Sequence, residues 1–150
     1  MIRLITRAET ASLVLLAKAS ETVSQGEIAI LIDALDDSDH KAIVYESQAG
    51  TVGFACYGPV PMTEGTWRLA WLFVREDQRC RGVGSRLLRH AEDDIRANHS
   101  GRMLYIEARS ASHPESTHSF CRANGYEDHA VLRDFFADGD SLMVYRKELR

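Results

Sequence analysis

The sequence predicts a single α/β domain, in which strands and helices occupy one chain segment after another. Segments with strand-like alternation and segments with helical periodicity follow one another along the whole chain. The length of 150 residues fits one hydrophobic core. No internal repeat, low-complexity stretch or linker divides the chain, so we expect one domain over residues 1–150.

The chain begins with a strand and two helices. Residues 2–6 alternate apolar and polar side chains, which predicts a short strand, and residues 9–19 carry apolar residues on one helical face. Ser24, followed three residues later by Glu27, forms a capping-box pattern that starts a second helix. The polar run 36–39 is expected to end this helix.

Three strands are expected next. Residues 40–46 and 51–57 are joined through 48–50, a hairpin pattern, and the prolines after residue 57 are expected to break the second strand. Residues 66–74 form the third strand. A period of two would place four large residues of that strand on one face, where they form core or line an acceptor pocket: Trp67, Leu69, Trp71 and Phe73.

The second half of the chain alternates helices and strands. A helix is expected to begin within residues 79–88 and to continue to about residue 97. A strand then covers 102–108, and a helix covers 114–124. Two strands, 126–132 and 141–147, close the chain around a turn at 137–140.

Composition limits the kinds of partner. The net charge of −4 argues against general nucleic-acid binding. No apolar run approaches the roughly 20 residues that span a bilayer, and no signal-peptide pattern is seen, so we expect a cytoplasmic protein without a membrane partner. The three scattered cysteines suggest neither a disulfide framework nor a zinc site, and the histidines show no metal-ligand spacing.

The most informative segment is the loop Arg79-Cys-Arg-Gly82-Val-Gly84-Ser-Arg86, between the third strand and a helix. The first amides of a helix lack intrahelical acceptors and lie at the positive end of the helix dipole. Glycines at 82 and 84 remove side chains that would keep an anion away from these amides. The loop is therefore predicted to bind a diphosphate.

Two common diphosphate motifs do not fit this loop. A Walker loop needs Lys and then Ser or Thr after its last glycine, but Ser85 and Arg86 follow Gly84. A dinucleotide fingerprint needs a third glycine at the position that Leu87 occupies.

The spacing Arg79-x-x-Gly82-x-Gly84 resembles the acyl-CoA pyrophosphate loop of the GCN5-related N-acetyltransferase (GNAT) family. The order of predicted elements is similar to that fold over nearly the full length. The pair Phe120-Cys121 and the later Gly125-Tyr126 resemble the family's Phe-Tyr pair in the last helix and the Gly-aromatic pair that enters the next strand. The resemblance implies a mixed, mostly antiparallel sheet that is flanked by helices and whose central strands splay apart.

The resemblance implies transfer of an acetyl group from acetyl-CoA to a primary amine by direct attack. It assigns the oxyanion role to the backbone amide of Phe73. The residues that it implies in acetyl-CoA binding are Leu72, Phe73, Val74, Arg79, Arg81, Gly82, Val83, Gly84, Ser85, Arg86 and Phe120.

The proton-transfer groups depart from the family pattern. Cys121 replaces the usual tyrosine acid and is our candidate, since a thiol of ordinary pKa suits a departing thiolate. It is equally interpreted as a small buried helix residue, with Tyr126 as a substitute acid. Glu107 is the first candidate for the base, and Glu46 and Glu64 are weaker ones.

Alternatives from other classes stay open at this stage. The missing tyrosine allows an acyl-CoA-binding module without transfer activity, which would act as a sensor, and an interaction domain whose loop binds nothing. For an enzyme, the acceptor is a small-molecule or peptide amine, and the resemblance also allows a homodimer.

Overall fold

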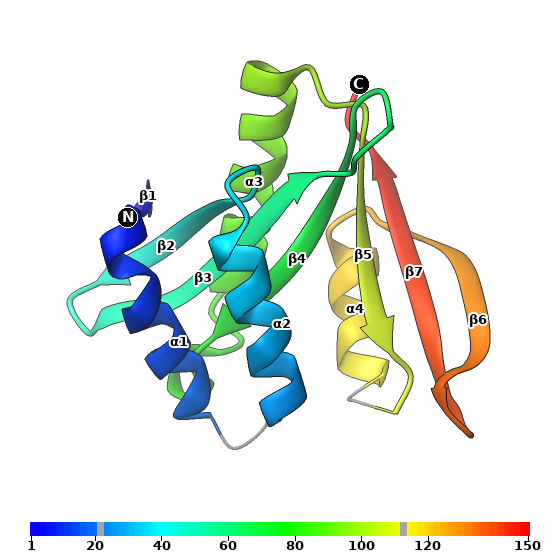
Figure 1. Cartoon of the computed structure of the whole chain (residues 1–150), viewed down its shortest axis with the longest axis horizontal. Coiled ribbons are helices and arrows are strands. Elements are labelled where there is room, and N and C mark those ends of the chain that lie inside the picture. Colours follow the sequence, from blue (N-terminus) through cyan, green and yellow to red (C-terminus); the bar gives the residue numbers. More distant parts are fainter. Residues whose placement is uncertain (21–22, 112–113) are drawn as a thin grey trace.

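The computed structural model describes residues 1–20, 23–111 and 114–150. Its elements follow the predicted order (Figure 1). The strands are β1 (Ile2–Leu4), β2 (Lys41–Ser47), β3 (Gly50–Pro59), β4 (Thr66–Val74), β5 (Met103–Arg109), β6 (Glu127–Ala137) and β7 (Asp140–Glu148). The α-helices are α1 (Thr10–Lys18), α2 (Gln25–Asp36), α3 (Val83–His99) and α4 (Pro114–Ala123).

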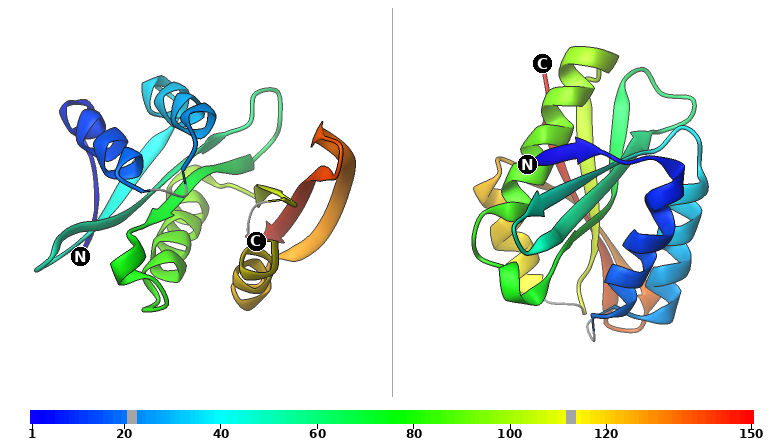
Figure 2. Two further views of the ribbon diagram at one scale, coloured as in Figure 1. Left: turned by 90° about the horizontal axis from the view of Figure 1, so that it is seen from below. Right: turned by 90° about the vertical axis from the view of Figure 1, so that its left-hand side faces the viewer.

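The strands form one mixed sheet in the order β1-β2-β3-β4-β5-β7-β6. Only β4 and β5 pair in parallel among the strands of the described chain, and the other neighbours are antiparallel. Helices α1 and α2 lie on one face, and α3 and α4 lie on the other (Figure 2). This arrangement confirms the predicted fold class.

Each face of the sheet has its own core. Under α3 and α4 the buried cluster includes Leu87, Leu88, Leu104 and Ile106. Under α1 and α2 it includes Leu31, Phe54 and Phe73. The predicted capping box starts α2, since the Glu27 amide donates to Ser24 Oγ at 3.2 Å.

A bulge in β4 makes the predicted single-face stripe wrong. Tyr57 pairs with Leu69 but Cys56 pairs with Trp71, so Ala70 is an extra residue in the ladder. An extra residue inverts the faces of everything that follows it. Trp67 and Leu69 therefore pack in the α3 core, whereas Trp71 and Phe73 pack in the α1–α2 core.

Several predicted boundaries shift. A short 3-10 turn at Arg7–Glu9 precedes α1, and β3 extends to Pro59 as its last residue, beyond the predicted break. Strand β6 continues to Ala137 through a wide irregularity in its pairing with β7 after Leu132. No helix in the described ranges is both long enough and apolar enough to cross a membrane.

Candidate active site

The loop before α3 presents a run of free amides. The first helical bond runs from the Arg86 amide to the Gly82 carbonyl at 3.0 Å. The backbone N–H groups of residues 80–85 have no acceptor in the described part of the chain, and no side chain caps α3. Cys80 and Gly82 both have positive φ, of 61° and 83°. Consecutive free amides in such a turn form an anion-binding concavity at the positive end of α3.

Glycine serves a different purpose at each of the two loop positions. Gly82 needs its left-handed φ, and a Cβ placed on it would meet nothing within 4 Å. Gly84 allows close approach, because a Cβ there would lie 3.3 Å from Phe120 Cε2 and 3.7 Å from Val74 Cγ2. The end of β4, the start of α3 and α4 thus meet at this point, which brings together Val74, Gly84 and Phe120, three residues expected to bind acetyl-CoA.

The side chains of the loop divide into anchored and free groups. Arg79 Nε donates to the Val74 carbonyl at 3.0 Å, and Arg86 donates to the Tyr45 hydroxyl at 3.0 Å. Ser85 Oγ accepts at 3.2 Å from the side chain of Asn124, the residue that follows α4, a contact that the sequence did not predict. Arg81 is exposed and has no side-chain partner among the described residues.

Strands β4 and β5 part beside this loop. Their parallel pairing runs from Thr66–Met103 to Leu69–Ile106 and stops there. The C-terminal part of β4, residues 70–74, keeps its pairing with β3 only. The backbone N–H and C=O groups of this segment that point away from β3 are consequently left without a strand partner. This separation of β4 and β5 is the predicted splay of the central strands.

The register decides which amides of β4 face the open side. The Arg75 amide donates to the Val52 carbonyl of β3 at 2.9 Å. Because donors alternate along an antiparallel strand, the Phe73 amide also points to β3, opposite Phe54. The amides of Leu72 and Val74 point to the side that β5 has left. The Phe73 amide, to which the resemblance assigns the oxyanion role, therefore points into the ladder with β3.

The C-terminal half of β5 carries Glu107. Leu104 and Ile106 are buried in the α3 core, so Tyr105 and Glu107 alternate onto the α1–α2 face. Glu107 is exposed and is the first residue of β5 beyond its pairing with β4. The weaker base candidates lie elsewhere: Arg3 binds Glu46 at 2.7 Å, and Glu64 borders a surface hollow at the other end of α3.

The comparisons with known proteins agree with this geometry. The model of the acetyltransferase (GNAT) domain matches residues 38–128, which is more than half of the chain. The chain belongs to the GNAT family. It is an N-acetyltransferase, and its acetyl donor is acetyl-CoA.

Solved structures extend the GNAT fold over the whole chain. A GNAT-family acetyltransferase of Desulfovibrio desulfuricans has a TM-score of 0.91 and 25% identity, over 100% of this chain and 99% of its own. The aminoglycoside 6′-N-acetyltransferase of Enterococcus faecium has a TM-score of 0.82 and 17% identity, over 100% and 97%. Another aminoglycoside 6′-N-acetyltransferase, crystallised with coenzyme A, has a TM-score of 0.81 and 17% identity, over 100% and 97%. No protein of curated function matches in sequence.

The residue at the GNAT tyrosine position is buried. Cys121 is 1% exposed and belongs to the core under α3 and α4. Burial, with a smaller effect of Asp128, raises the pKa of its thiol to about 12. Tyr126, the substitute acid, is also buried, and its hydroxyl donates a hydrogen bond to Glu92 at 2.6 Å. Burial and then that hydrogen bond raise the pKa of Tyr126.

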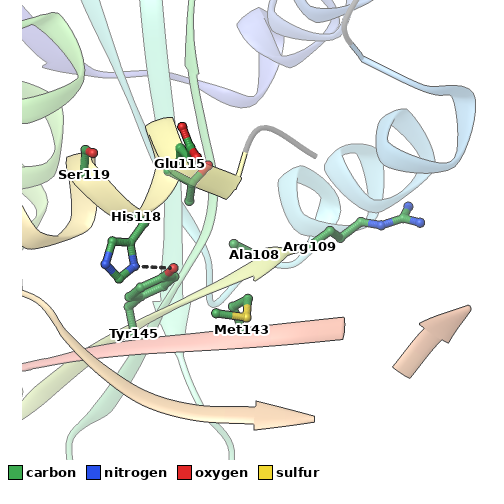
Figure 3. A pocket seen from close by; sticks show the side chains of 8 residues that line it. Ala108, Arg109, Glu115, His118, Ser119, Met143 and Tyr145 are labelled. Atoms are coloured by element: carbon green, nitrogen blue, oxygen red, sulfur yellow. Dashed lines mark hydrogen bonds between the residues drawn. The ribbon is translucent and has the colours of Figure 1, made fainter. Parts of the chain in front are cut away.

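A shallow hollow of about 410 Å³ lies between α4, β5 and β7 (Figure 3). It is lined by Ala108, Arg109, Glu115, Thr117, His118, Ser119, Met143 and Tyr145. His118 Nδ1 lies 3.3 Å from the Tyr145 hydroxyl, within hydrogen-bond distance. None of the predicted GNAT site residues lines this hollow. The described residues contain no group of side chains suited to a metal ion.

Proposed function

We propose that the chain transfers the acetyl group of acetyl-CoA to a primary amine in one step. The amine nitrogen attacks the thioester carbon, a C–N bond forms, and the C–S bond breaks to release CoA as a thiolate. The free amides of residues 80–85 carry this proposal, because they supply donors for a diphosphate beside an open strand edge.

Release of CoA thiol from acetyl-CoA, measured with and without added amines, tests the proposal. The transferase requires thiol release that depends on the amine and yields the acetylated amine by mass spectrometry. Saturable acetyl-CoA binding without any amine-dependent release would instead favour the acyl-CoA sensor.

The open edge of β4 supports two functions. The Val74 amide and the Leu72 carbonyl are positioned to pair with the pantetheine arm as an added strand would. The Leu72 amide, rather than that of Phe73, is proposed to donate to the oxygen that becomes negative during attack. Such a preorganised donor typically contributes about 2.7–4 kcal/mol to the transition state.

Glu107 is proposed to take the proton from the attacking ammonium. We expect Glu107→Gln to lower kcat/KM at neutral pH by about 100-fold, the lower range for loss of a positioned base. Steady-state assays from pH 7 to 10 measure this. The deficit should shrink at high pH, where the amine loses its proton to solvent. A constant deficit across that range would exclude Glu107 as the base.

Cys121 is proposed to be structural. The Cys121 thiol, with a pKa of about 12, is a weaker acid than the CoA thiol, whose ordinary pKa is near 8.5. Proton transfer from Cys121 to the CoA thiolate would therefore be unfavourable by about 5 kcal/mol. We expect Cys121→Ala to change kcat by less than about threefold, with CoA thiolate protonated by solvent. A fall of tenfold or more in kcat, with unchanged acetyl-CoA affinity, would return the acid role to Cys121.

Two further features support proposals about the compartment in which the enzyme acts and about its oligomeric state. All three cysteines are free, and Cys80 is exposed, which supports the reducing environment of the cytoplasm. The edge strand β6 exposes a set of large apolar side chains that supports a homodimer: Val131, Leu132, Phe135 and Phe136.

A further inference from the structure

Arg68 is a half-buried cation without a hydrogen-bonded or ion-paired partner among the residues that the structure describes. It lies on β4 between Gly58 of β3 and Tyr105 of β5. Its guanidinium makes no hydrogen bond, ion pair or ring contact with any described residue. Burial of a charged group is costly unless an opposite charge or hydrogen-bond acceptors compensate it.

The Asp37 carboxylate, which interacts electrostatically with Arg68, is already engaged by other groups. Asp37 Oδ1 accepts the Asp39 amide at 2.9 Å, and Asp37 Oδ2 lies 3.1 Å from His40 Nδ1. The Asp39 amide chiefly lowers the pKa of Asp37, His40 adds to the effect, and Arg68 contributes least. No Arg68–Asp37 ion pair within 4.0 Å forms in the described structure.

The surroundings of Arg68 combine free donors with the proposed base. Trp71, the next residue on this face after the bulge, has a buried Nε1–H without an acceptor among the described residues. Tyr105 lies beside Arg68, and Glu107 follows two residues along β5 on the same face. Burial first, and then the charge of Glu107, raise the pKa of Tyr105, while Arg68 opposes them.

We infer that the amine acceptor is an amino carboxylate, a small molecule with an anionic carboxylate close to its amine. This inference rests on the proposed transferase function. Arg68 presents a planar fork of donors that matches a carboxylate. Glu107 lies two residues along β5 from Tyr105, the register partner of Arg68, and each strand residue advances about 3.3 Å. Arg68 and Glu107 are therefore only a few residues' length apart. The carboxylate would bind Arg68 while the ammonium faces Glu107.

Matched acceptor pairs test the inference: each amino acid is compared with its decarboxylated amine, as phenylalanine with phenethylamine. We expect kcat/KM to favour the best amino acid over its amine by about 10- to 100-fold, the usual effect of a charge-assisted hydrogen bond. Arg68→Gln should abolish this preference by raising KM for the amino acid, with acetyl-CoA affinity unchanged. Arg68→Lys, which keeps the charge, should restore part of it.

Arg133→Gln on the exposed strand β6 is the control and should leave the preference intact. A wild-type preference for the decarboxylated amines, or an unchanged preference in Arg68→Gln, would overturn the inference. If Arg68→Gln does not fold, Arg68→Lys and the wild-type preference decide the matter. Failure to bind acetyl-CoA at all would instead contradict the proposed function, so the two failures are distinguishable by calorimetry.

Discussion

Replacement of Gly82 by valine is expected to abolish measurable binding of acetyl-CoA. The left-handed φ of 83° strains any side chain with a Cβ, so the turn that presents the free amides would have to change its shape. Loss of most pyrophosphate contacts should raise the Kd by at least about 100-fold, since hydrogen bonds to a charged group contribute about 1.5–3 kcal/mol each. Calorimetric titration with acetyl-CoA measures the effect.

Gly50→Val is the matched control for this variant. Gly50 lies at the β2–β3 hairpin with a φ of 89°, and a Cβ there also meets nothing within 4 Å. Both variants should lose similar stability, on the order of 1–2 kcal/mol from backbone strain. Acetyl-CoA binding within threefold of wild type in Gly82→Val, or an equal loss in both variants, would refute the loop as the diphosphate site.

A backbone ester at Leu72 is expected to slow acetyl transfer strongly while leaving the fold intact. Replacing this residue by its α-hydroxy acid analogue removes one N–H group and keeps the side chain. The Leu72 amide faces the open side of β4 and has no ladder partner on β3. We expect kcat to fall by about 10²–10³-fold, as for removal of one oxyanion donor.

The corresponding ester at Phe73 separates chemistry from structure. Its amide is assigned to the ladder with β3, so this ester should cost about 1 kcal/mol of unfolding free energy and leave kcat within a few-fold. Denaturant unfolding and single-turnover rates measure the two effects. The reverse pattern, with the rate lost at Phe73 and stability lost at Leu72, would restore the oxyanion role that the sequence indicates for Phe73.

Local chemistry explains which parts of the fold were predictable. Element order follows from apolar periodicity, and the start of α2 follows from the Ser24–Glu27 capping box. The anion loop is likewise local, because two glycines and a helix start lie within a few residues. Such features depend on neighbouring residues in the chain, which the sequence gives directly.

The bulge at Ala70 marks where sequence reasoning fails. Nothing in the run Thr66–Val74 distinguishes a regular strand from a bulged one, since the extra residue is defined by pairing with β3. Misplacing it inverts the faces of Trp71 and Phe73. The grouping of Arg68 with Tyr105 and Glu107 was also missed, because it depends on the register between β4 and β5, which are separated by α3.

Calorimetric titration of the wild-type protein with acetyl-CoA, with adenosine as the control ligand, examines the diphosphate site without any substitution. We expect saturable binding at one site for acetyl-CoA and none for adenosine, which lacks the diphosphate and the pantetheine arm. Absence of acetyl-CoA binding at millimolar concentration, or equal binding of adenosine, would contradict this expectation.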